Sequence, residues 1–217
     1  MDSVTVDVWS DVVCPWCYIG KRRFETALDG FGHRDSVRVR WRSFELDPSG
    51  SREAELTLPE RISRDLGGDV EQAAQRIAMV SGLAAEAGLD YRLDRARPVN
   101  SFDAHRLMQY GDQAGAGEEV RERLMRAYTA EGAVVSDIDT LVRIGAEAGL
   151  DPRGTEKMLR GTDFADTVRA DEDLGHRLGV SGVPTFVFAG RYAVSGAQPV
   201  EVFMRLLDEA ASASQDS

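Results

Sequence analysis

Two cysteines, Cys14 and Cys17, are the residues of this sequence best suited to chemistry, and they stand in the segment Cys14-Pro15-Trp16-Cys17. A thiolate attacks disulfides, and a second thiol nearby can then attack the mixed disulfide and release the product. The spacing permits this because residues three positions apart on a helix lie on neighbouring faces. Cys14 is therefore the candidate nucleophile, and Cys17 is the candidate resolving thiol.

The same pair of cysteines could instead be half of a zinc site or a purely structural pair. Zinc needs about four ligands, whereas this chain has 2 cysteines and 3 histidines, and His33, His105 and His176 are widely separated. We therefore expect no metal. A structural role is disfavoured because the pair stands where a strand gives way to a helix, and the helix N-terminus stabilises a thiolate. Core packing does not need that placement, but redox catalysis does.

The elements around the cysteines are readable from periodicity. Residues 4–9 alternate between valine and other side chains, which predicts a strand, and apolar residues recur at helical spacing from 19 to 31. A second alternation over residues 37–44 predicts another strand that ends at Asp47-Pro48-Ser49-Gly50. The chain therefore begins β-α-β, with the cysteine pair at the first strand-to-helix junction.

The middle of the chain is predicted to be helical. Residues 53–164 carry successive helix starts and stops and no strand signal, whereas residues 165–217 return to the order α-β-β-α. We therefore predict an α/β protein with a thioredoxin fold and a large all-helical insertion between the β-α-β and α-β-β-α halves. The thioredoxin-like domain would comprise residues 1–52 plus 165–217, and the helical insertion domain residues 53–164.

The segment Gly182-Val183-Pro184-Thr185 is a second candidate site, because its X-Pro bond opens a predicted strand. Most such bonds in folded proteins are trans, and a trans proline that starts a strand is the alternative here. The thioredoxin fold, however, carries a cis proline in the loop that faces its redox pair. We therefore expect a cis Val183–Pro184 bond, with the backbone beside it binding an extended substrate segment.

Pro15 and Trp16 are expected to form part of the substrate-binding surface around the first cysteine. Proline is tolerated in the first turn of a helix, because its missing N–H has no intrahelical partner there. Trp9 is expected in the core or in the wall of the cleft.

Three further polar residues are weaker candidates. Asp11 could relay protons to Cys17, although an acid before a helix is commonly a turn or cap residue. His105 could point from the insertion toward the cleft, although a lone helical histidine is more often structural. Lys21 could lower thiol pKa values, but we expect it on a solvated helix face.

The charge of the chain argues against polyanionic partners. The formal net charge of -11 opposes binding to nucleic acid and to anionic membrane surfaces. No apolar run approaches the ~20 residues of a membrane helix. The segment from Met1 to Asp7 lacks the basic and apolar regions of a secretory signal, and a lone close cysteine pair suits a reducing compartment. We therefore expect a cytoplasmic protein.

Three separated motifs resemble one family. They are Cys14-Pro15-Trp16-Cys17-Tyr18-Ile19-Gly20-Lys21, the stretch Asn100-Ser101 with Ala104-His105-Arg106-Leu107, and Gly182-Val183-Pro184-Thr185-Phe186 followed by Ser195-Gly196-Ala197-Gln198. Over nearly its whole length the chain resembles the DsbA family of thiol-disulfide oxidoreductases, FrnE-like branch. The resemblance implies a nucleophile at Cys14, a resolving thiol at Cys17, a cis proline at Pro184, and a homodimer. Unlike better-known periplasmic members, this sequence has no histidine between its cysteines, so a strongly oxidising role is not expected.

The predicted function is thiol-disulfide exchange or isomerisation through a mixed disulfide with a protein, peptide or small-molecule substrate. The redox-active group would be the Cys14–Cys17 disulfide, with no bound cofactor. An alternative is a glutathione-dependent isomerase or transferase, because the fold resembles kappa-class glutathione transferases and 2-hydroxychromene-2-carboxylate isomerases, with glutathione as co-substrate. Those relatives typically carry serine at the first cysteine position, so both cysteines favour redox chemistry. A non-enzymatic, chaperone-like binding protein is a third reading.

Overall fold

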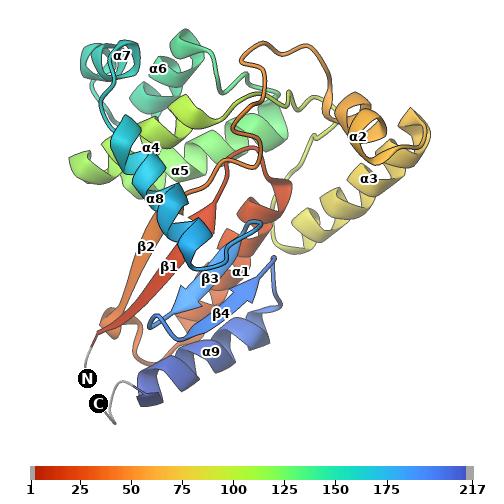
Figure 1. The fold of residues 1–217 in the computed structure, drawn as a ribbon. Helices are drawn as coiled ribbons and strands as arrows, with labels where there is room; N and C mark the ends of the chain where they lie inside the picture. The colour runs from red at the N-terminus through yellow and green to blue at the C-terminus, as the bar shows by residue number, and fades with distance from the viewer. Residues whose placement is uncertain (1–2, 214–217) are drawn as a thin grey trace.

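The computed structural model describes residues 3–213, and within them four strands form one mixed sheet in the order β2-β1-β3-β4 (Figure 1). The central strand β1 (Val4–Ser10) runs parallel to β2 (Val37–Ser43) and antiparallel to β3 (Thr185–Phe188), which pairs in turn with β4 (Tyr192–Ser195). The carboxyl end of β1 therefore lies in the middle of the sheet, and the chain continues from it into the cysteine segment.

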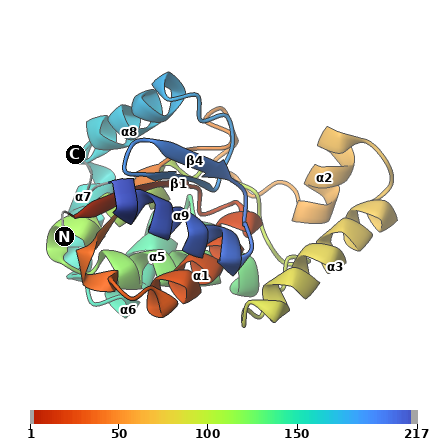
Figure 2. The same cartoon turned by 90° about the horizontal axis from the view of Figure 1, so that it is seen from below.

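Helices cover both faces of this sheet (Figure 2). The helices α1 (Pro15–Gly30) and α9 (Val200–Ala213) pack on the face that carries the three valines of β1, where Phe24 and Phe203 meet with ring centroids 5.5 Å apart. The helix α8 (Ala165–Arg177) packs against the opposite face. The alternating sequence of β1 thus specifies two buried faces.

The long middle of the chain is helical, as predicted. Between β2 and α8 lie α2 (Leu58–Leu66), α3 (Val70–Glu86), α4 (Phe102–Ala114), α5 (Gly117–Arg126), the π-helical turn η2 (Ala127–Glu131), α6 (Ile138–Glu147) and α7 (Pro152–Arg160), and a short 3-10 helix η1 (Arg34–Ser36) precedes β2. The hairpin of α2 and α3 extends away from the rest of the molecule (Figure 2). None of the helices within residues 3–213 is long and apolar enough to cross a bilayer.

The order β-α-β, helices, α-β-β-α confirms the predicted fold class. The domain boundaries at residues 52 and 165 stay a prediction. One apolar core contains Cys17 and Ile19 of α1 together with Leu107 and Leu124 of the helical segment, so α1 packs against both the sheet and the helical segment.

Local capping explains where several of these helices begin. Thr57 and Glu60 form a reciprocal capping box at α2. The carboxylates of Asp69, Asp137 and Asp151 each accept a hydrogen bond from a backbone N–H in the first turn of α3, α6 and α7. These caps are short-range features, which is why the succession of helix starts in this segment can be predicted from the sequence.

Candidate active site

The cysteine pair begins helix α1. Cys14 is the N-cap residue and Pro15 occupies the first turn, and the Cys17 N–H donates to the Cys14 carbonyl oxygen at 3.0 Å. Both residues are free thiols and both are buried, with 5% of Cys14 and 1% of Cys17 exposed. The Cys14 thiol contributes to the raised pKa of Cys17, so the two sulfurs lie near each other. The helix start therefore presents two adjacent sulfurs, the outer one slightly more accessible.

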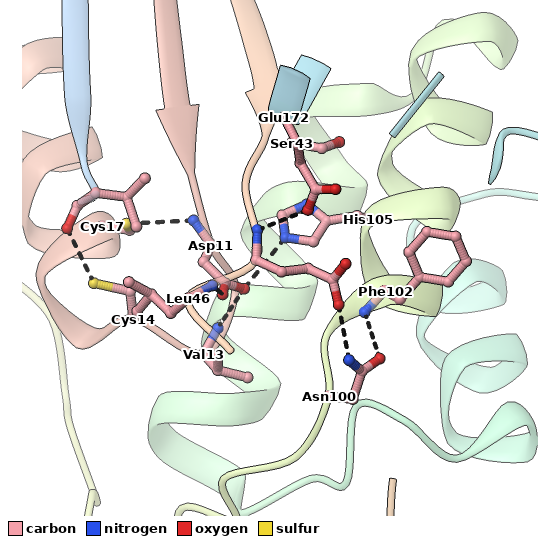
Figure 3. A network of polar contacts seen from close by, with 12 residues as sticks. Asp11, Val13, Cys14, Cys17, Ser43, Leu46, Asn100, Phe102, His105 and Glu172 are labelled. Carbon is pink, nitrogen blue, oxygen red and sulfur yellow. Dashed lines mark hydrogen bonds and ion pairs between the residues drawn. The ribbon is translucent and has the colours of Figure 1, made fainter. Parts of the chain in front are cut away.

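The Cys14 thiol points at the loop before β3. Its Sγ donates to the carbonyl oxygen of Val183 at 3.5 Å (Figure 3). In the described part of the chain, Sγ makes no capping bond to the amides of α1. With both thiols free, the candidate nucleophile Cys14 therefore contacts the backbone beside Pro184.

The Val183–Pro184 peptide bond is cis, the form expected from the fold. Pro184 is buried, and its carbonyl oxygen accepts a hydrogen bond from the Gly196 N–H at 2.7 Å. The Thr185 hydroxyl donates to the Gly182 carbonyl oxygen at 2.7 Å. These bonds tie the loop to the β3–β4 hairpin and fix the Val183 carbonyl opposite the thiol.

Gly20 permits the close approach of α1 and this loop. A Cβ at Gly20 would lie 2.9 Å from Cγ of Pro184, which is closer than packed carbon atoms allow. We expect Gly20→Ala to lower the free energy of unfolding by about 1–3 kcal/mol, as overpacking does, and to slow disulfide exchange by displacing Pro184. Urea unfolding and an insulin-reduction assay would measure both effects.

Gly82→Ala is the matched control for that substitution, because Gly82 lies inside α3 and a Cβ there meets nothing within 4 Å. Alanine at an open helical position should stabilise the protein by up to about 1 kcal/mol. If Gly20→Ala behaved like this control, the contact with Pro184 would not constrain residue 20.

Cys17 lies deeper than Cys14, and the backbone of Asp11 contacts its sulfur. The backbone N–H of Asp11 donates to Cys17 Sγ at 3.4 Å (Figure 3). Burial raises the pKa of the Cys17 thiol well above its ordinary value, the Cys14 thiol raises it further, and the Asp11 amide acts in the opposite direction. Cys17 is therefore a protonated thiol that needs assistance to become a nucleophile.

Asp11 and His105 form a fully buried pair beside the resolving thiol. His105 Nε2 lies 3.3 Å from Asp11 Oδ1, and both side chains have no solvent exposure. The same carboxylate accepts bonds from the N–H groups of Val13 at 3.3 Å and Leu46 at 2.8 Å. Burial lowers the pKa of His105, but the bond to Asp11 and its charge outweigh burial, so the pKa is raised overall.

In the sequence, Asp11 and His105 are two separate candidates, and only the structure brings them together. Asp11 follows β1, whereas His105 lies in the first turn of α4, where its N–H donates to the Ser101 carbonyl oxygen at 3.0 Å. No spacing rule relates positions on two elements that meet only through tertiary packing. The position of His105 four residues after Ser101, the N-cap of α4, is the one local feature that singles out this histidine.

Acidic residues surround the far side of the imidazole. Glu45 donates its backbone N–H to Glu172 Oε1 at 3.1 Å, and its carboxylate accepts a bond from Asn100 at 2.8 Å (Figure 3). Arg169 binds the carboxylates of Glu45 at 2.5 Å and Glu172 at 2.6 Å. The imidazole thus lies between Asp11, whose backbone bonds to the Cys17 sulfur, and these glutamates, to which its Nδ1 makes no hydrogen bond within the described residues.

The two tryptophans near the pair have different environments. Trp16 is 36% exposed next to Cys14, which agrees with its predicted place on the surrounding surface. Trp9 is fully buried against Phe44 and Val180, and its indole N–H donates to the Asp171 carbonyl oxygen at 2.9 Å. The structure places Trp9 in the core beneath α8 and not in the wall of the cleft, because it lies on the α8 face of β1.

The expectation that Lys21 lies on a solvated helix face is wrong. Lys21 is 0% exposed, and its Nζ lies 2.5 Å from Glu25, 2.5 Å from Glu118 and 3.0 Å from Glu122. Burial lowers the pKa of Lys21, but the charges and hydrogen bonds of Glu118 and Glu25 outweigh burial and raise it overall. Since α5 supplies two of these partners, Lys21 joins α1 to the helical segment.

Tyr91 is a site residue that sequence reasoning missed. It lies between α3 and α4, its hydroxyl donates to the Pro15 carbonyl oxygen at 2.6 Å, and its ring stacks on Tyr18 at 6.2 Å. Burial raises the pKa of Tyr91, and charge on Cys14 or Cys17 raises it further. Its phenol therefore lies near the sulfurs, but no motif in the loop indicates this.

Metal binding finds no support in the described residues. Within residues 3–213, no group of three or more histidine, cysteine, aspartate or glutamate side chains is arranged to hold a metal ion. The pair at Cys14 and Cys17 is accompanied by one histidine, and its imidazole faces Asp11.

A pair of cysteines at the start of the helix after the central strand, opposite the loop that carries Pro184, defines a thioredoxin-fold protein with a Cys-x-x-Cys site. A family model described as the DSBA-like thioredoxin domain matches residues 5–208. The chain therefore belongs to the DSBA-like thioredoxin domain family, and assignment to the FrnE-like branch stays a prediction.

Known proteins resemble the chain over nearly its whole length. A probable DsbA oxidoreductase from Streptomyces coelicolor has 39% sequence identity and a TM-score of 0.93, covering 96% of this chain and 90% of that chain. The uncharacterized protein YwbO of Bacillus subtilis is 27% identical over 209 residues, which are 95% of this chain and 97% of that protein. A 2-hydroxychromene-2-carboxylate isomerase structure has 18% identity and a TM-score of 0.69, with 98% of each chain covered. At that identity the likeness shows the fold alone.

Proposed function

We propose that this protein is a thiol-disulfide oxidoreductase or isomerase that works through Cys14 and Cys17. The observation that carries the proposal is the placement of two free, buried thiols three residues apart at the start of α1, with Cys14 Sγ 3.5 Å from the Val183 carbonyl oxygen. Membership of the DSBA-like family and likeness to a probable DsbA oxidoreductase support it.

The reaction divides into two exchanges. The Cys14 thiolate attacks a substrate disulfide, forming a Cys14–substrate disulfide and releasing one substrate thiolate, which takes up a proton. Cys17 then loses its proton and attacks Cys14, so that the Cys14–Cys17 disulfide forms and the second substrate thiol leaves. The substrate gains two electrons and the protein loses two. Isomerisation follows when a substrate thiol, in place of Cys17, displaces Cys14.

The surface near the pair suits a protein or peptide substrate. Trp16 and Leu46 are large apolar side chains that are exposed at 36% and 48%, and the segments that carry them adjoin Cys14 and Asp11. An extended segment carrying a disulfide could lie on these side chains and bond to the backbone beside Pro184. The cytoplasmic location and the homodimer stay predictions.

Trapping with Cys17→Ser tests the proposal. Without a resolving thiol, the Cys14 mixed disulfide should persist, so incubation with a disulfide-bonded peptide should give one covalent adduct per chain, visible by mass spectrometry and removed by dithiothreitol. The wild type should give none at completion. Absence of an adduct on Cys17→Ser would contradict the proposed function.

Glutathione conjugation distinguishes the alternative. A glutathione-dependent isomerase or transferase would turn over a glutathione conjugate in the wild type and in Cys14→Ser alike, because serine stands at that position in such relatives. We expect no turnover of 1-chloro-2,4-dinitrobenzene with glutathione by either protein, while the wild type reduces insulin.

A further inference from the structure

The Asp11–His105 pair is more than packing requires. Asp11 Oδ1 and Oδ2 already accept bonds from the N–H groups of Val13 and Leu46, so the carboxylate is satisfied without the imidazole. His105 Nδ1 is buried and has no hydrogen-bond partner within the described residues. Burying a charged pair costs desolvation free energy, and a protein in which apolar residues of similar volume replace such a pair is often equally stable. Stability alone therefore does not explain this histidine.

Asp11 connects the imidazole to the resolving thiol. Its backbone N–H donates to Cys17 Sγ at 3.4 Å, while its carboxylate faces His105 Nε2 at 3.3 Å. The charge of Asp11 is also felt across the site, because Asp11 and Cys14 both add to the effect of burial in raising the pKa of Tyr128. A negative charge at Asp11 opposes a second negative charge on a neighbouring sulfur.

We propose that His105 is a positioning residue for the resolving step: acting through Asp11, its imidazolium compensates the carboxylate beside Cys17 and favours the Cys17 thiolate. This inference rests on the proposed function. In the step that it assists, the Cys17 S–H bond breaks, the Cys17–Cys14 bond forms, the bond from Cys14 to the substrate sulfur breaks, and the departing substrate thiolate takes up the proton. The histidine is supplied by α4, so the helical segment would tune the chemistry of a thiol on α1.

The charges around His105 favour its protonated form. Asp11 faces it from the loop after β1, Glu45 from the segment after β2, and Glu172 from α8, while Arg169 of α8 binds both glutamates. The imidazolium is therefore retained at higher pH than in an unfolded chain, and its effect on Cys17 should be lost only as the pH rises through the raised pKa of His105.

The test separates the two exchanges in one experiment. Reduced protein mixed with 5,5′-dithiobis(2-nitrobenzoate) should release one thionitrobenzoate when Cys14 attacks and a second when Cys17 resolves the mixed disulfide. We expect His105→Gln to slow the second release about tenfold near neutral pH and to shift its pH profile upward by about one unit, leaving the first release unchanged. His176→Gln is the matched control, since His176 is exposed.

Two outcomes would overturn different statements. An unchanged second release in folded His105→Gln, or equal slowing of both releases, would overturn the role of His105. Cys17→Ser should show no second release, and its persistence there would overturn the proposed function instead. Circular dichroism and the urea midpoint would verify that each variant is folded.

A second measurement does not depend on any change at His105. If His105 alters the charge state of Cys17, then the state of Cys17 must alter the titration of His105 by the same free energy. Replacing His33 and His176, both exposed, by glutamine leaves a single histidine whose ring carbons can be followed by NMR. We expect the ring carbons of His105 in the dithiol form to report a second titration step as Cys17 ionises, a step that Cys17→Ser lacks. Absence of that step would overturn the inference.

Discussion

Cys14→Ser is expected to abolish disulfide exchange, with a loss of at least about a thousandfold in rate. An alcohol is almost fully protonated at neutral pH and is a far weaker nucleophile than a thiolate, and no stable disulfide can form through it. Residue 14 is the N-cap of α1, where serine is favoured. The fold should therefore persist, and the insulin-reduction rate with dithiothreitol would report chemistry alone.

Cys17→Ser is the control for that variant. It removes the other thiol from the same helix turn but leaves Cys14 able to attack, so it should retain the first exchange and fail only in the second. Residual insulin reduction by Cys14→Ser above one hundredth of the wild-type rate would mean that Cys17 attacks substrates directly. The 5% exposure of Cys14 against 1% for Cys17 argues for the expected order of attack.

The order of elements is predictable because its signals are local. Alternating valines over residues 4–8 and aspartate caps at Asp69 and Asp151 act within a few positions of the backbone they organise. Which helix covers which face of the sheet depends instead on side chains from distant segments. The central position of β1, between β2 and β3, is an example of such long-range pairing.

The residues of the candidate site also fall into those with a local sequence signal and those placed by long-range packing. Cys14, Cys17 and Pro184 are recognisable because each belongs to a short motif whose neighbours are fixed by the chain. Asp11 and His105 are each visible as a candidate, but their pairing arises only when α4 packs over the end of β1. The burial of Lys21 and the contact of Tyr91 with Pro15 likewise require partners that no local pattern specifies.

Lys21→Met is expected to lower the free energy of unfolding by about 2–4 kcal/mol at neutral pH, because removing one partner of a buried ionic cluster leaves charges uncompensated. This loss is smaller than the roughly 3–5 kcal/mol typical of a broken, fully buried ion pair, because the side chains of the three glutamates are 31% to 52% exposed. Methionine keeps the apolar stem, so the loss would reflect the ammonium. Urea unfolding of this variant and of Lys157→Met, at the exposed second lysine, would isolate the buried cluster.

The pH dependence of that difference has a definite sign. Burial raises the pKa of Glu122, but the bonds from Tyr18 and Lys21 outweigh burial, so its pKa is lowered overall. Glu122 therefore stabilises the wild type above its unfolded pKa of about 4.3, and this contribution is lost as the pH falls through the lowered pKa. Lys21, with its raised pKa, contributes to stability below an unfolded pKa of about 10.4, and this contribution is lost as the pH rises through the pKa of the folded state.

The difference in unfolding free energy between wild type and Lys21→Met should thus be widest between about pH 5 and 10 and shrink on either side. A gap that stayed constant down to strongly acidic pH would show that Lys21 stabilises the fold through its packing and not its charge.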